Sequence, residues 1–133
     1  MPSDNVETLR RGYEALNTGD LSGVRSLLHP EIEWQEGDGA PEAGIHQGRE
    51  GFESFLSKWL ESFDDFRIEP QEIIEQGDRL IVVVQQSGTG RASGIEVEAQ
   101  IAHVWTVADG MAVRWQSYSS REEALGFQRD RSP

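Results

Sequence analysis

The chain has 133 residues with no cysteine, and its 24 acidic against 12 basic residues give a formal net charge of −12. This length suits one domain over residues 1–133 with a core of its own, and the missing thiols exclude disulfides and thiolate metal sites. The negative charge disfavours nucleic acid and anionic membranes as partners, and without a signal peptide or bilayer-spanning stretch in the sequence we expect a cytoplasmic protein.

The first half of the chain predicts three helices. Apolar residues recur at helical spacing over residues 6–16, which predicts the first helix. A second, short helix follows Asp20, whose carboxylate can cap its first turn, and Pro30 prevents it from continuing. The third helix has the clearest pattern, since its apolar residues between 52 and 63 fall on one helical face. That face must pack against a large apolar surface.

Alternating apolar residues in the rest of the chain predict strands. A short strand carries Ile32, Trp34 and Glu36 on one face, and a loop rich in glycine and proline follows it. Two tight turns, each a pair of glycine and aspartate, join the later strands into an antiparallel meander. The four long strands are predicted over residues 66–75, 79–88, 96–107 and 111–119. A closing helical turn over 120–126 and a disordered tail over 128–133 complete the prediction.

Helices followed by strands predict an α+β fold, in which three N-terminal helices pack on a curved, mainly antiparallel sheet. We expect an aromatic-lined pocket between the two layers. Residues 80–84 are apolar on both sides of their strand, so the second face of the sheet also needs a cover. We therefore predict a homodimer through the sheet.

Three stretches of the sequence carry a resemblance to a known family, and together they span nearly the whole chain. They read YEALNTGDLSGVRSLLHPEIEW, GREGFESFLSKW and IAHVWTVADGMAVRWQSY. They resemble the nuclear-transport-factor-two-like superfamily, in its SnoaL-like and ketosteroid-isomerase-like branch. The resemblance implies a cone-shaped fold that encloses a pocket. This superfamily includes isomerases, polyketide cyclases, dehydratases, epoxide hydrolases and proteins without catalysis, so individual residues must identify the reaction.

The resemblance gives a first test of mechanism through the ketosteroid isomerases. These enzymes combine a carboxylate base on the first strand with a tyrosine and a protonated aspartate that stabilise the enolate. The resemblance places Glu36 at the position of the base, on the same face as Ile32 and Trp34. The tyrosine position falls on Gly12 and the aspartate position on Ala102. The steroid-isomerase mechanism is therefore not expected here.

A second test concerns relatives of limonene-epoxide hydrolase, which activate water with an Asp-Arg-Asp arrangement. One of these carboxylates lies in a W-R-D-Y segment of the last strand, where Ser117 stands in this chain. The strand over residues 81–88 contains neither aspartate nor arginine. Epoxide hydrolysis by that route is not expected either.

Glu36 is the first candidate catalytic residue. Burial near Trp34 would raise the pKa of its carboxyl group and suit it to act as a general base. The alternative is that Glu36 is the first solvated residue of an acidic loop that also contains Asp38 and Glu42. Both interpretations stay open, because perturbed carboxylates mark functional sites only statistically.

His103 is the second candidate, because a neutral imidazole can transfer a proton near physiological pH. Alternation of apolar residues along its strand points His103 and Trp105 towards the core. The family resemblance instead points Ala102, Val104 and Thr106 into the pocket and sends His103 to the opposite face. We give the resemblance preference. The spacing of the histidines and carboxylates predicts no metal site, and we expect no cofactor.

Aromatic side chains from several elements are predicted to converge between the helices and the sheet, where they would form either a core or the walls of a ligand pocket. The predicted substrate pocket comprises Tyr13, Trp34, Phe55, Trp59, Val83, Gln85, Ala102, Val104, Trp115 and Ser117. One predicted function is an isomerase, cyclase or dehydratase acting on a small hydrophobic carbonyl compound by proton transfer through Glu36 or His103. The other is a non-catalytic binding or accessory domain that holds an apolar metabolite or pairs with another protein.

Overall fold

The computed structural model describes residues 4–35 and 46–130, which form four helices and six strands. In chain order the elements are α1 (Asp4–Thr18), α2 (Leu21–Arg25), β1 (Leu28–Gln35), β2 (His46–Gln47), α3 (Arg49–Glu61), β3 (Phe63–Gln76), β4 (Arg79–Gly90), β5 (Glu96–Ala108), β6 (Met111–Tyr118) and α4 (Arg121–Asp130). This order confirms the predicted α+β fold.

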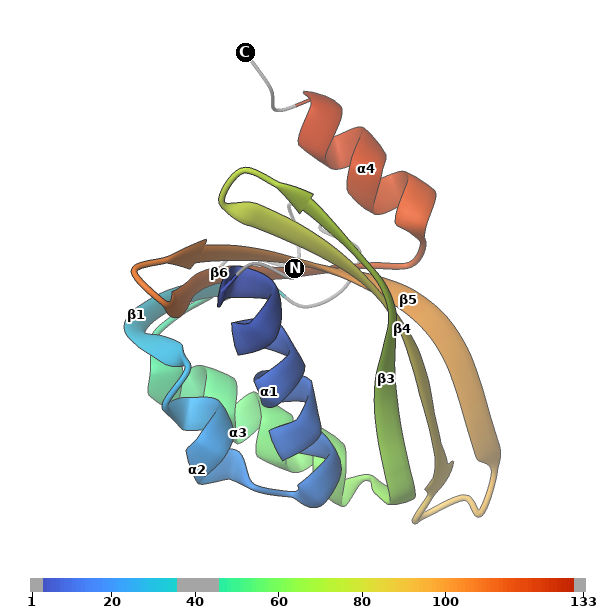
Figure 1. Cartoon of the computed structure of the whole chain (residues 1–133). Helices are drawn as coiled ribbons and strands as arrows, with labels where there is room; N and C mark the ends of the chain where they lie inside the picture. The colour runs from blue at the N-terminus through green and yellow to red at the C-terminus, as the bar shows by residue number, and fades with distance from the viewer. Residues whose placement is uncertain (1–3, 36–45, 131–133) are drawn as a thin grey trace.

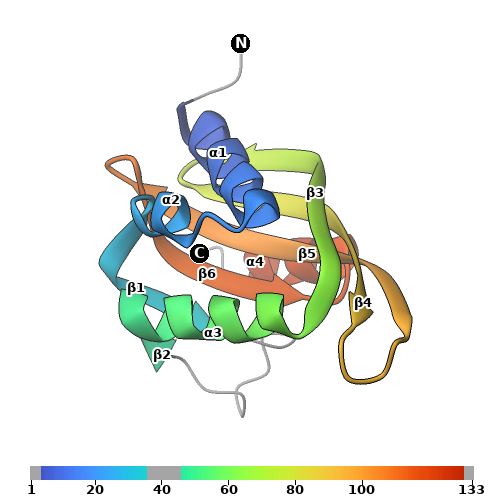
Figure 2. The same cartoon turned by 90° about the horizontal axis from the view of Figure 1, so that it is seen from below.

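The strands form one curved sheet in the order β2-β1-β6-β5-β4-β3. Its neighbours pair antiparallel except β1 and β6, which are parallel. The helices α1, α2 and α3 lie within the curve of the sheet, and α4 lies on its outer side (Figure 1). The view from below shows α1 and α3 crossing the inner face of the sheet on opposite sides of α2 (Figure 2). This layering is the predicted cone, with the space between helices and sheet at its centre.

The second helix is shorter than predicted, and local chemistry explains both of its ends. Asp20 caps it, because a carboxylate oxygen accepts from the Gly23 N–H and the Ser22 hydroxyl at 3.0 Å each. The pKa of Asp20 is held below its ordinary value, mainly by the hydrogen bond from the Gly23 N–H and to a smaller extent by that from the Ser22 hydroxyl. The helix ends at Arg25, because Leu28 already pairs with Ala112 of β6.

Two further elements differ from the sequence prediction. The two-residue strand β2 pairs with β1 in a region predicted as loop, and it is too short for periodicity to reveal. The C-terminal helix α4 runs to Asp130 and is longer than the closing turn predicted over residues 120–126. None of the described helices is long and apolar enough to cross a bilayer.

The sheet is buried on both faces along residues 80–84, as the apolar run there predicted. Leu80, Val82 and Val84 belong to the inner core under the N-terminal helices. Ile81 belongs to a separate outer cluster. The outer cluster joins side chains of the sheet to Ala124 of α4 and comprises Ile81, Ala102, Val104, Tyr118 and Ala124. The helix α4 therefore covers part of the face predicted to meet a second subunit, and the homodimer stays a prediction.

Candidate functional site

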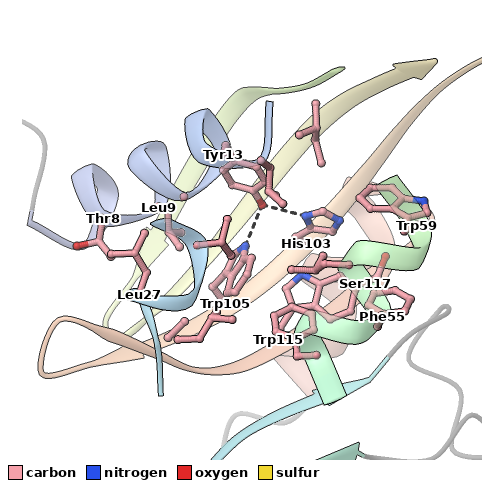
Figure 3. Close-up of a pocket in the computed structure, with 18 residues that line it drawn as sticks. Thr8, Leu9, Tyr13, Leu27, Phe55, Trp59, His103, Trp105, Trp115 and Ser117 are labelled. Carbon is pink, nitrogen blue, oxygen red and sulfur yellow. Dashed lines mark hydrogen bonds between the residues drawn. The ribbon is translucent and has the colours of Figure 1, made fainter. Parts of the chain in front are cut away.

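A cavity of about 160 Å³ lies between the three N-terminal helices and the inner face of the sheet (Figure 3). Its walls are almost entirely apolar, with aromatic rings from α1, α3, β5 and β6. The described residues that line it are Thr8, Leu9, Gly12, Tyr13, Leu16, Val24, Leu27, Leu28, Phe52, Phe55, Leu56, Trp59, Ile68, His103, Trp105, Ala112, Trp115 and Ser117. A few polar groups in an apolar enclosure are typical of small-molecule sites.

Three of the lining side chains are joined by hydrogen bonds. The Trp105 indole N–H donates to the Tyr13 hydroxyl oxygen at 2.9 Å. The same hydroxyl lies 2.9 Å from His103 Nδ1. Figure 3 shows the Tyr13 hydroxyl between the two rings that β5 projects into the cavity. His103 and Trp105 are two residues apart, so the pleat of the strand turns both towards α1.

Burial shifts the pKa values of the two titratable groups in this hydrogen-bonded set, Tyr13 and His103. It raises the pKa of the Tyr13 hydroxyl well above its ordinary value, and the weaker opposing effect is the hydrogen bond from Trp105. It lowers the pKa of His103 to about 3, because a charged imidazolium would lose its hydration. At physiological pH the site therefore holds a neutral phenol and a neutral imidazole.

Aromatic packing holds the histidine ring in place. The Trp115 ring meets His103 edge to face, with ring centres 5.3 Å apart. The Tyr13 ring lies nearly parallel to the imidazole, with an interplanar angle of 8°. On the floor of the cavity Phe52 packs against Trp115 at 5.2 Å. These contacts restrict how far His103 can rotate when a ligand enters.

Five of the ten predicted pocket residues line the cavity. They are Tyr13, Phe55, Trp59, Trp115 and Ser117. Trp34 lies behind this wall, where its ring stacks on Phe52 and Phe55 at 5.5 and 5.4 Å and on His46 at 4.3 Å. Trp34 therefore supports the wall without forming its inner surface.

The other four predicted pocket residues lie on the opposite face of the sheet, so their assignment to this cavity is wrong. In β5 the register pairs Ala102 with Val83 and His103 with Val82, and side chains alternate between faces along each strand. Val104 joins Ala102 in the outer cluster. Gln85 lies two residues after Val83 and so on the same face of the sheet, where its side-chain amide donates to Glu98 Oε1 at 3.0 Å. Residues 102 and 104 thus pack beneath α4.

The same register corrects the predicted direction of His103. Apolar alternation along β5 pointed His103 and Trp105 inwards, and the structure agrees with that pattern. The family resemblance, to which we gave preference, assigned the wrong face of β5 because its match is shifted by one residue along the strand. Trp105 was consequently missed as a cavity residue, although the odd-numbered alternation of its strand was the signal that could have identified it. Its indole N–H proves to be one of the few polar groups of the site.

Glu36, Asp38 and Glu42 lie outside the described residues, so the predicted carboxylate base stays a prediction. Within residues 4–35 and 46–130, no three or more histidine or carboxylate side chains gather closely enough to hold a metal ion.

The cone of helices on a curved sheet, with a cavity inside it, is the architecture of the nuclear-transport-factor-two-like fold. This chain belongs to the SnoaL-like domain family, whose sequence model matches residues 9–115. That match extends from the first helix to the Trp115 wall of the cavity. No curated protein matches the chain in sequence.

Solved structures of similar proteins share the fold over nearly the full length. The chain is 28% identical to TerC, crystallised with polyporic acid, with a TM-score of 0.76 over 96% of this chain and 97% of that one. It is 27% identical to a protein of unknown function from Burkholderia pseudomallei K96243, with a TM-score of 0.77 over 98% and 100%. A putative SnoaL-like polyketide cyclase from Jannaschia sp. CCS1 is 18% identical, with a TM-score of 0.77 over 98% and 94%, and shows the fold alone.

Proposed function

We propose that this protein binds a compact hydrophobic carbonyl compound in the cavity and catalyses a proton transfer next to the carbonyl group, as an isomerase, cyclase or dehydratase. One observation carries the proposal. His103 lines an aromatic cavity, and among the described residues its Nε2 atom has no hydrogen-bond partner. A polar atom at the wall of an apolar cavity, without a protein partner, is the natural contact for a polar atom of a ligand.

The size of the cavity supports a compact ligand. At about 160 Å³ it resembles the engineered apolar cavity of about 150 Å³ that accommodates benzene. A compound with one six-membered ring therefore fits without a rearrangement of the walls. A larger compound requires side chains such as Trp59 or Phe55 to move.

The absence of charge at the walls supports a neutral ligand. The described lining residues include no lysine, arginine, aspartate or glutamate. A carboxylate or ammonium group buried there would lose its hydration without a counter-charge, which costs several kcal/mol in proteins. A ketone, aldehyde or ester meets the condition of a polar oxygen without a charge.

The proton transfer assigns different roles to the two predicted catalytic residues. A hydrogen bond to a carbonyl oxygen stabilises the enolate that forms when a neighbouring C–H loses its proton. His103 lies where it can provide that contact, but a pKa of about 3 makes it a weak base. Glu36 follows directly after β1 in the sequence and stays our proposed base.

The comparison with TerC suggests one probe for this proposal. That protein was crystallised with polyporic acid. We include polyporic acid in the ligand panel to test whether the cavity opens for a larger compound. The smaller members of the panel are cyclohexenone, acetophenone and benzoate.

The test measures the thermal stability of the protein against this panel. A ligand at one hundred times its dissociation constant adds about 2.7 kcal/mol to the free energy of unfolding. We expect stabilisation by the neutral ketones and none by benzoate. Product analysis would then compare wild type with Glu36→Gln, which should bind but not turn over, and with the control Tyr118→Phe on the outer face. If no carbonyl compound stabilises the wild type, the proposal is wrong.

One observation favours a second candidate, a binding domain without catalysis. Neither titratable group at the described cavity has a pKa near physiological pH, since burial raises that of Tyr13 and lowers that of His103. A protein that only holds an apolar metabolite needs no poised acid or base. This candidate predicts that Glu36→Gln leaves binding unchanged and that no bound ketone is converted.

A further inference from the structure

The hydrogen bonds from Trp105 through Tyr13 to His103 have a single direction. An indole N–H can only donate, so the Tyr13 oxygen is the acceptor of that bond. The Tyr13 hydroxyl has one proton, and among the described residues its other hydrogen-bond partner is His103 Nδ1. If the oxygen accepted from both rings, the hydroxyl proton would have no partner among the described residues. The arrangement in which each group is paired therefore has the hydroxyl donating to Nδ1.

This direction determines the tautomer of the histidine. A neutral imidazole carries one proton, and the nitrogen that accepts a hydrogen bond is the one without it. His103 Nδ1 accepts from Tyr13, so the proton lies on Nε2. The Nε2 atom is on the side of the ring turned away from Tyr13, towards Trp59 and Ser117 (Figure 3).

We infer that Trp105 and Tyr13 are positioning residues, which hold His103 as the Nε2–H tautomer and so present a hydrogen-bond donor to a neutral acceptor oxygen of the ligand. The ligand part rests on the proposed function, whereas the tautomer is a property of the protein without ligand. The substrate class this selects is a single-ring ketone or aldehyde, with its oxygen on His103 and its ring among the aromatic walls.

The geometry makes both positioning residues necessary. Tyr13 comes from the middle of α1, whereas His103 and Trp105 come from β5, which pairs on both sides with neighbouring strands. Without the Trp105 N–H, the Tyr13 hydroxyl can rotate and accept from a histidine Nδ1–H instead. Without the Tyr13 hydroxyl, nothing among the described residues distinguishes the two tautomers.

The tautomer can be measured on the ligand-free protein by long-range proton–nitrogen correlation of the imidazole rings. The chain has three histidines, and the signals that disappear in His103→Gln identify the relevant ring. In wild type we expect a protonated Nε2 and an unprotonated Nδ1. Tyr13→Phe should give a mixture of the two tautomers, and Tyr118→Phe, which removes a buried hydroxyl from the other face, should match wild type.

Trp105→Phe provides a second variant if Tyr13→Phe does not fold. It keeps the Tyr13 hydroxyl but removes the donor that orients it, so the mixed tautomer is expected again. A wild-type His103 protonated on Nδ1 would overturn the inference. An unchanged Nε2–H tautomer in a folded Tyr13→Phe or Trp105→Phe protein would overturn it as well, because the positioning role would then be absent.

The ligand part is tested with acetophenone and ethylbenzene, which have similar shapes but differ in the carbonyl oxygen. Wild type should bind acetophenone about tenfold more tightly, the equivalent of about one good hydrogen bond. In Tyr13→Phe this ratio should fall in proportion to the remaining fraction of the Nε2–H tautomer, about twofold for an equal mixture, while the affinity for ethylbenzene changes little. Equal affinities in wild type would overturn the positioning inference and leave the pocket intact. Binding of neither compound would instead overturn the proposed function, whatever the tautomer.

Discussion

Buried apolar side chains lie on both faces of the sheet, and among the described residues the inner ones enclose the candidate site. On the inner face, the rings of Trp105, Trp115 and His103 leave a cavity beneath α1 and α3. On the outer face, Ala102 and Val104 pack directly against α4. Apart from Tyr118, the side chains of the outer cluster are small or branched. They close the gap to the helix, whereas the several flat rings of the inner face, set at angles to one another, leave space between them.

The comparison shows what separates a core from a site in this fold. Buried apolar side chains occur on both faces, so burial alone does not identify the site. The distinguishing feature is the set of hydrogen bonds that joins Trp105, Tyr13 and His103 at the wall of the cavity. Predictions that compare matched changes on the two faces therefore test the assignment of function to the inner face.

The largest effects are expected from truncating one large side chain on each face. Phe52 is 1% exposed and Ile81 is fully buried. Phe52→Ala should lower the free energy of unfolding by about 3–5 kcal/mol, and Ile81→Ala by about 2–5 kcal/mol, through lost apolar contacts and a new void. Denaturant unfolding of both variants measures these values.

Ligand preference then separates the two faces. Phe52→Ala enlarges the proposed ligand cavity, so it should favour ketones with a second ring over acetophenone. Ile81→Ala leaves the cavity unchanged and serves as the matched control. If both variants alter ligand preference alike, the inner cavity is not the binding site.

The next effect is a pH dependence that belongs to the inner face alone. The pKa of His103 is about 3 in the folded protein and 6.5 ordinarily, so between these values the unfolded state binds more protons than the folded state. The stability contributed by the neutral ring is therefore fully present above pH 6.5 and is lost as pH falls. From pH 7 to pH 5 the loss is about 2 kcal/mol.

Denaturant unfolding at several pH values should show this loss in wild type but not in His103→Leu. Carboxylates titrate in both proteins, so their contribution cancels in the difference between the two. Identical pH profiles would mean that His103 is solvated and charges freely, which would contradict its burial in the cavity wall.

Local patterns in the sequence were enough to predict the fold, but not which face of β5 forms the site. Helical spacing and tight turns located the helices and the long strands to within a few residues. It was harder to predict which residues of β5 face inwards, because the strand has apolar side chains on both faces and a second apolar cluster lies on the outer one. His103 and Trp105 follow the apolar alternation, whereas the family pattern shifted by one residue selected Ala102 and Val104.

Other features depended on contacts between distant residues. The pairing of Tyr13 with His103 joins positions 90 residues apart, and nothing in the local sequence indicates it. The strand β2 forms only because β1 lies beside it. These are properties of the assembled tertiary structure, and periodicity along the chain does not encode them.

A smaller effect of opposite sign is expected at Gly12, which lines the cavity from α1. A methyl group there would meet Leu27 Cδ1 at 3.4 Å, the mobile end of a side chain, and the backbone is helical. Gly12→Ala should therefore raise the free energy of unfolding by about 0.5–1 kcal/mol, since glycine is a poor helix former.

The same methyl group occupies part of the cavity, so Gly12→Ala should also weaken acetophenone binding. A variant that is more stable but binds less tightly would show that the cavity is retained for a ligand at the expense of stability. A loss of stability would mean that Leu27 cannot move aside. Thermal unfolding with and without acetophenone measures both quantities in one experiment.

The smallest effect concerns the attachment of α4 to the outer face. Arg121 Nε lies 2.8 Å from Glu72 Oε1, and both side chains are nearly half exposed. A double-mutant cycle with Arg121→Ala and Glu72→Ala should give a coupling of about 0.2–1 kcal/mol that shrinks as salt is added. A larger, salt-resistant coupling would show that this pair is shielded from water in solution. Since a single chain leaves the pair exposed, the shielding would have to come from a second molecule, as the predicted homodimer through the sheet requires.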